Sequence, residues 1–238
     1  MDYGIGWYDA NKTVANTEDD EMCWAAAASN ILAWGNWNAG MTVFSTEDAI
    51  FQHYQNHWTD DGGLMEFGWE WWINGTNSSP TVPGWSQVDV AGGVPADGFW
   101  PQYNFYDYYY RTWEDDLAMQ AIDGYLHAGY GTTIGIYTED GGHALTIWGY
   151  DYDDQTGDYT GLIFSDSDDY LSADGSYKNL WLSSLSYDTV AGKWYIGGSN
   201  WYIGEVMALE GKPVPEPGTL VLLGFGLIGL AACRIRRK

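Results

Sequence analysis

The apolar residues of this 238-residue chain change their spacing near residue 130. Before that point, a helical period predicts helices over about 19–34, 45–57, 64–73 and 113–127. After it, a period of two predicts strands over about 132–137, 143–152, 159–165, 179–182, 193–196 and 205–209. Helices followed by strands are typical of an α+β fold. Asp19 or Asp20 would cap the first helix and Ser45 the second.

The charge of the chain is strongly unbalanced. Residues 1–213 hold 32 acidic and five basic groups, a formal charge of −27. Such a surface repels phosphate backbones, so we expect no nucleic-acid partner. Fifteen Trp, nineteen Tyr and seven Phe are typical of a folded chain. We therefore predict one domain over 1–213, with residues 74–103 as a long surface excursion because they hold four of the seven prolines.

Residues 214–238 form a separate segment. Val-Pro-Glu-Pro-Gly is followed by a largely apolar run over 219–233, which contains Cys233, and by Arg-Ile-Arg-Arg-Lys. The run is slightly shorter than a typical membrane-spanning helix, and its basic end would stay cytoplasmic. The segment resembles the PEP-CTERM sorting signal of Gram-negative bacteria, with Pro215, Glu216 and Pro217 as the signature.

That resemblance implies export to the cell envelope or beyond, transient membrane anchoring by a short transmembrane segment, and an exosortase-type processing partner. The opposite end, Met1–Trp7, has neither the basic nor the apolar region of a signal peptide. Since an exported chain needs such a signal, we expect the natural start to lie further upstream.

Cys23 is the only thiol before the tail and lies near the start of a predicted helix. The helix dipole favours a thiolate there, whereas the acidic residues 19–21 oppose it, so a nearby cation is required. An inert buried cysteine is the alternative interpretation. Lys12, the only Lys or Arg before Arg111, could help hold an oxyanion, or could be a solvated surface lysine.

His143 follows two glycines and opens a predicted strand. If that strand and the next form a hairpin about residues 154–157, His143 falls opposite about position 167, beside Asp166 and Asp168. A carboxylate–imidazole hydrogen bond would fix the tautomer and stabilise the imidazolium. A purely structural histidine is the alternative.

Three further groups are candidate ligand sites. Residues 151–158 resemble a calcium loop, but Leu162 stands where the loop needs a glutamate, so a hairpin turn is expected. His53 and His57 are one helical turn apart but have no evident third metal ligand. Five tryptophans could stack on sugars, or could instead pack in the core. They are Trp69, Trp71, Trp72, Trp85 and Trp100. We predict no cofactor and no metal.

Two blocks of sequence resemble the IdeS/Mac immunoglobulin-degrading cysteine endopeptidases. They are residues 6–13 with 19–32, and residues 142–153 with 164–169. The resemblance implies a papain-like fold with an N-terminal helical half and a C-terminal antiparallel β half. It further implies these roles: Cys23 as nucleophile, His143 as general base, Asp166 as the orienting carboxylate, Asp168 as an accompanying acid and Lys12 in the oxyanion hole.

The chain departs from that family at Trp24, where a glycine usually follows the nucleophile, and in its middle region. The resemblance therefore implies a protein or peptide substrate, and it does not extend to specificity for immunoglobulin. The resulting prediction is an exported cysteine endopeptidase that acts through a Cys-His-Asp triad and a thioester acyl-enzyme. Two alternatives remain open: a catalytically inactive papain-like surface protein that binds glycans or proteins, and a transglutaminase-like acyltransferase.

Overall fold

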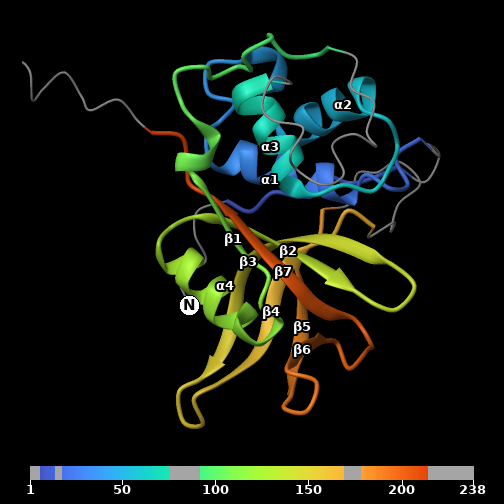
Figure 1. Ribbon diagram of the computed structural model, residues 1–238, viewed down its shortest axis with the longest axis vertical. Helices are drawn as coiled ribbons and strands as arrows, with labels where there is room; N and C mark the ends of the chain where they lie inside the picture. The colour runs from blue at the N-terminus through green and yellow to red at the C-terminus, as the bar shows by residue number, and fades with distance from the viewer. Residues whose placement is uncertain (1–5, 14–17, 76–91, 169–177, 214–238) are drawn as a thin grey trace, which may run out of the picture.

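The computed structural model describes residues 6–13, 18–75, 92–168 and 178–213. Within these ranges the α-helices are α1 (Cys23–Trp34), α2 (Glu47–His57), α3 (Met65–Asn74) and α4 (Ala118–His127). Short 3-10 helices are η1 (Thr42–Phe44), η4 (Phe105–Asp107) and η5 (Asp115–Leu117). Helices α1 to α3 lie together above the strands in Figure 1, whereas α4 lies beside the strands.

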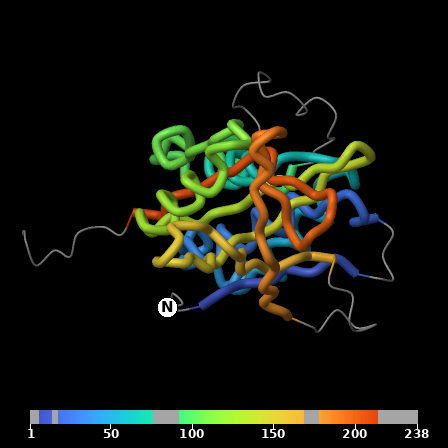
Figure 2. The backbone as a smooth tube through the Cα atoms, turned by 90° about the horizontal axis from the view of Figure 1, so that it is seen from below, coloured from blue at the N-terminus to red at the C-terminus, as the bar shows by residue number. Residues whose placement is uncertain are grey.

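The strands form one antiparallel sheet in the order β1-β7-β2-β3-β4-β5-β6. Their bounds are β1 (Tyr109–Thr112), β2 (Gly131–Tyr137), β3 (Gly142–Asp153), β4 (Asp158–Ser165), β5 (Trp181–Asp188), β6 (Lys193–Ile196) and β7 (Tyr202–Leu209). Strand β6 also pairs with β7 through Tyr195 and Tyr202. Six strands, β7 and β2 to β6, thus close into a barrel, and β1 extends the sheet beyond β7. Figure 2 shows the molecule from below, with the strands in front of α1 to α3.

The predicted papain-like fold, with a helical half and an antiparallel β half, is wrong. The strands instead form a closed six-stranded barrel, and the described residues contain only four α-helices, one of which packs on the barrel. Closure needs tilted and bent strands. Register shifts supply bends at Gly135/Ile136, Ile147/Gly149 and Asp151/Tyr152, and a two-residue period in the sequence does not reveal them.

The two faces of the barrel wall pack into two different cores. On β3, Leu145 and Ile147 face the core inside the barrel, which also receives Met119 and Ile122 of α4. Ala144, which precedes Leu145 and lies on the opposite face, packs into the core shared with α1 to α3. Strand alternation therefore explains why the helices cover one side of the barrel wall.

Helix α1 lies at the centre of the helical layer, and every residue from Trp24 to Ala33 is buried. Its run Ala25–Ala28 keeps the helix thin enough to pack closely on several sides. The predicted caps are wrong. Met22 is the N-cap of α1 and has no capping side chain, while Thr46 caps α2 by accepting a hydrogen bond from the Ala49 N–H.

Most predicted elements are confirmed, with three differences. Strand β1 was not predicted, and β5 extends to Asp188 although its side chains are largely exposed and lack apolar alternation. Helix α4 begins at Ala118 rather than near residue 113. Among the described residues, no helix is long and apolar enough to cross a membrane. Three predicted features lie outside the described residues: the transmembrane run with Cys233, the Pro215–Pro217 signature, and Trp85.

Candidate active site

Cys23 and His143 come together where the helical layer meets the barrel. Cys23 is the first residue of α1, and His143 is the second residue of β3. The two side chains are close enough for Cys23 to contribute to the raised pKa of His143. Cys23 is a free, partly exposed thiol, and the His143 side chain is 14% exposed. The pair is therefore accessible to solvent without being surrounded by it.

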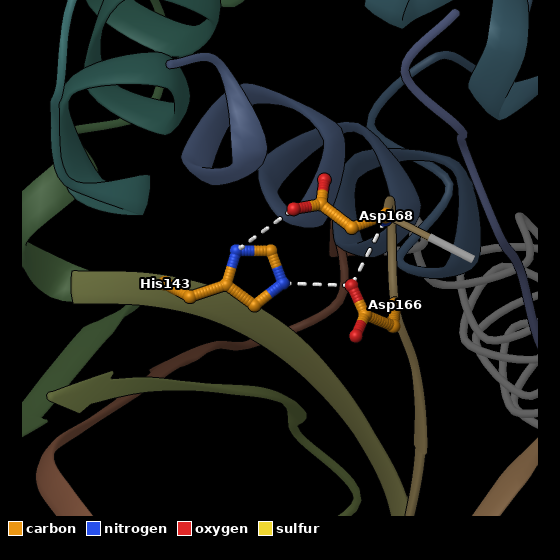
Figure 3. A group of neighbouring side chains, drawn as sticks. All are labelled: His143, Asp166 and Asp168. Carbon is orange, nitrogen blue, oxygen red and sulfur yellow. Dashed lines mark hydrogen bonds and ion pairs between the residues drawn. The ribbon is translucent and has the colours of Figure 1, made fainter. Parts of the chain in front are cut away.

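Two carboxylates from the end of β4 flank the His143 ring, as Figure 3 shows. The His143 Nε2–H donates to Asp166 Oδ1 at 2.7 Å, and Nδ1 lies 3.8 Å from Asp168 Oδ2. Asp166 Oδ1 also accepts the Asp168 N–H at 2.9 Å, which fixes the carboxylate. The register of β3 and β4 pairs Thr146 with Ser165, close to the predicted register, so that residues 166–168 reach the histidine.

Lys12 lies at the same site and is 5% exposed. Its Nζ lies 2.6 Å from Asp168 Oδ1 and also donates to the Asp20 carbonyl at 2.6 Å. The Lys12 backbone N–H donates to the Ser167 carbonyl at 3.0 Å. Lys12 is thus a buried, ion-paired group rather than a solvated surface lysine. The structure brings all five predicted site residues together.

A buried asparagine connects the element that carries Cys23 to the strands that carry its partners. Asn30 of α1 accepts the Ala10 N–H at 2.8 Å and donates to Thr146 Oγ1 on β3 at 3.0 Å. Its amide also reaches Ser165 Oγ on β4 at 3.5 Å, and Ser165 donates to the Tyr8 carbonyl. These bonds fix α1 relative to β3, β4 and the segment before Lys12.

The electrostatics of the site favour a protonated histidine. Burial lowers the pKa of His143, but the hydrogen bonds to Asp166 and Cys23 and the negative charges of both partners outweigh burial and raise this pKa to about 10. Burial raises the pKa of Asp166, but the hydrogen bond and positive charge of His143 outweigh it and lower this pKa below its ordinary value. Both pKa shifts favour an imidazolium ring held by a carboxylate.

Two cavities adjoin the Cys23–His143 pair. The larger, about 510 Å³, is bordered by Lys12, Asp166 and Asp168 and extends over the end of the barrel, where Phe164, Ile196 and Trp201 line it. The smaller, about 300 Å³, lies against residues 62–65 and is bordered by Tyr137 and Glu205. Both contain Cys23, Glu21 and His143, so an extended ligand could cross the pair from one cavity to the other.

His143, Asp166 and Asp168 could also offer ligands to a metal ion, since one ligand atom of each lies within 4.8 Å of the others. An imidazole with two carboxylates is a donor set that zinc accepts. Asp168 is already paired with Lys12, however. The raised pKa of His143 favours its protonated form, and a protonated imidazole has no lone pair for a metal. The arrangement suits an ion-paired imidazolium better than a metal.

The other candidate groups have structural surroundings. The rings of His53 and His57 meet edge to face with centroids 4.6 Å apart, and His53 Nε2 is hydrogen-bonded to the Gly93 carbonyl. Residues 154–157 form the turn between β3 and β4, as predicted. Trp69, Trp71 and Trp72 are fully buried and Trp100 packs against Lys212, so these four are not sugar platforms.

A polar cluster beside the site was not predicted. Arg111 of β1 contacts Glu66 of α3 at 2.6 Å and Glu205 of β7 at 3.1 Å. The Tyr137 hydroxyl donates to Glu205 at 2.8 Å. The four residues come from four separate elements, so nothing in their local sequence predicts the cluster.

Comparison with known proteins assigns one segment. Residues 213–237 match the PEP-CTERM protein-sorting motif. This is an exported protein. The motif marks it as associated with the cell envelope and sorted by an exosortase. No curated protein matches the chain.

Proposed function

We propose that this exported protein is a cysteine endopeptidase whose nucleophile is Cys23. The observation that carries the proposal is the grouping of a thiol, an imidazole and a carboxylate around one cavity: Cys23 lies beside His143, and His143 is hydrogen-bonded to Asp166 at 2.7 Å. A nucleophile, a base and a group that orients the base are the parts that acyl-transfer chemistry requires. The cavities on both sides of the pair leave room for a peptide.

Each step of the proposed reaction uses a described group. His143 holds the proton of Cys23, and the thiolate attacks the peptide carbonyl. The Cys23 backbone N–H lies at the N-terminus of α1, where the helix does not use it, and with Lys12 Nζ it would stabilise the oxyanion. His143 then protonates the leaving amine, and a thioester remains on Cys23. Water, deprotonated by His143, hydrolyses the thioester and restores the thiol.

The first test is the rate at which iodoacetamide alkylates Cys23 between about pH 4 and 9, because the thiolate is the reacting species. We expect fast alkylation well below neutral pH, lost in His143→Ala, with Cys23→Ser as the unreactive control. His127→Ala is the matched variant, since His127 forms another His–Asp pair, at 2.6 Å from Asp123, on the exposed face of α4. An alkylation rate that follows the pH profile of free cysteine would overturn the proposal.

Turnover then separates hydrolysis from acyl transfer, because the same residues support both. A peptide library incubated with the protein and a primary amine should give carboxylate termini. Amine incorporation that exceeds cleavage would favour the acyltransferase instead.

A further inference from the structure

The steps above leave the smaller cavity without a role. Its walls come from residues 62–65 and Phe67 on the helical side, and from Gly135, Tyr137 and Glu205 of the barrel. Cys23 and His143 form its inner border. A group in this cavity is therefore next to the carbonyl that the thiolate would attack.

The cavity has an apolar side and an acidic side. The partly exposed Leu64 and the buried Met65 and Phe67 form the apolar side, and Glu205 supplies a carboxylate. A glycine makes room for that carboxylate, because a Cβ on Gly135 would lie 2.5 Å from Glu205 Oε1. An apolar wall that ends at a carboxylate complements a side chain with an apolar stem and a cationic tip.

The charge of the cavity also favours a cation. Glu205 and Glu66 share one guanidinium, that of Arg111, so this cluster carries a net negative charge when both are ionised. Glu205 is 2% exposed, and burial raises the pKa of its carboxyl, so a further cationic partner would stabilise its ionised form. Glu21 adds a second carboxylate, and among the described residues that line the cavity there is no lysine or arginine. The charge of His143 is balanced by Asp166.

We infer that the smaller cavity binds the lysine or arginine side chain of the substrate residue that supplies the attacked carbonyl. The stem lies along Leu64, Met65 and Phe67, and the cation contacts the Glu205 carboxylate, whose oxygens have lone pairs beyond those used by Tyr137 and Arg111. This inference rests on the proposed function and names its substrate class.

The test uses three acetyl-aminoacyl chloromethyl ketones that carry a lysine, norleucine or glutamate side chain. Each alkylates a thiolate: the S–C bond forms, the C–Cl bond breaks and chloride leaves. Lysine and norleucine have the same four-carbon stem, and lysine adds an ammonium group to its last carbon, so their rate ratio isolates the cation. We expect the lysine probe to react at least about tenfold faster than the norleucine probe, the usual scale for a hydrogen bond to a charged group, and the glutamate probe to be slowest.

Variants locate the preference in the cavity. In Glu205→Gln the lysine-to-norleucine ratio should fall toward one. In Asp154→Asn, which removes one charge from the exposed β3–β4 turn, the ratio should stay at its original value. If Glu205→Gln does not fold, the order of the three probes on the unchanged protein decides the question.

The two proposals fail differently. Equal rates for lysine and norleucine, with iodoacetamide still fast and dependent on His143, would overturn the cavity assignment and leave Cys23 as the nucleophile. Iodoacetamide alkylation no faster than that of free cysteine would overturn the proposed function and the inference that rests on it.

Discussion

At the scale of single residues, each ring nitrogen of His143 faces a different partner set. Nε2 is held by Asp166 at 2.7 Å, and Nδ1 lies 3.8 Å from Asp168. Lys12 neutralises Asp168 at 2.6 Å. The positive charge on the ring is therefore balanced mainly by Asp166, and an activated cysteine needs such an imidazolium beside it.

Asp166→Asn tests this division through pH. The pKa of Asp166 is lowered in the folded chain, so its ionisation contributes stability above the unfolded value of 3.8, and that contribution is lost as the pH falls through the folded value. We expect the wild type to exceed Asp166→Asn in free energy of unfolding at pH 6, and the difference to shrink below about pH 4. Urea unfolding at several pH values measures the difference in free energy of unfolding between the two proteins. A difference that does not change with pH would show that the charge of Asp166 does not stabilise His143.

Lys12→Met separates an oxyanion role from a merely structural one. Peptide turnover passes through an oxyanion, whereas alkylation by iodoacetamide does not. If Lys12 stabilises the oxyanion, we expect turnover to fall by about 10²-fold and alkylation to fall far less. Lys178→Met is the matched control, because Lys178 is another ion-paired lysine, which contacts Glu47 and Asp48 away from the site. Equal losses of turnover and alkylation would indicate that Lys12 only holds Asp168.

At the scale of elements, the site depends on how α1 is fixed against β3 and β4. Cys23 is at the N-terminus of α1, whereas His143 and Asp166 are on the strands, so a small shift of the helix would separate them. Asn30 resists that shift because it hydrogen-bonds to the Ala10 N–H and to Thr146 within the packed interface.

Asn30→Ala should therefore affect both stability and reactivity. It leaves the buried Ala10 N–H without its acceptor, which costs about 1–3 kcal/mol in free energy of unfolding. The alkylation rate of Cys23 should also fall, because the helix loses its bonds to the strands. Asn56→Ala on the exposed face of α2 is the matched control. Loss of stability with an unchanged alkylation rate would show that Asn30 does not position Cys23.

At the scale of the whole molecule, the site and the sorting tail are attached to opposite ends of α1. The chain before the tail is held where the Lys212 N–H donates to the Gly35 carbonyl, just beyond the C-terminus of α1. Cys23 lies at the other end, roughly 18 Å away for a helix of this length. In Figure 1 the last described residues, coloured red, end beside the helical layer.

Removal of the tail should consequently leave the site intact. A chain that ends at residue 213 keeps the contacts of Lys212 with Gly35 and Trp100, and we expect its unfolding free energy and Cys23 alkylation rate to match those of the full chain. A chain that ends at residue 209 loses both contacts and should be less stable. Slower alkylation in the chain that ends at 213 would show that the tail contributes to the site.

The sequence by itself determined the features that depend on neighbouring residues. These are the four α-helices, most strands, the β3–β4 turn that brings Asp166 to His143, and the sorting motif at 213–237. Periodicity and turn chemistry act over a few residues, so they are readable without the fold.

Only the tertiary structure decided the features that join distant segments. Barrel closure depends on bulges and on the pairing of β6 with β7, and the strand period alone does not contain them. The Arg111–Glu66–Glu205 cluster joins three elements, and the ion pair of Lys12 with Asp168 spans most of the chain. Such contacts depend on how the elements pack against one another. The sequence therefore predicted which residues form the candidate site, but it did not predict the barrel or the acidic cavity beside that site.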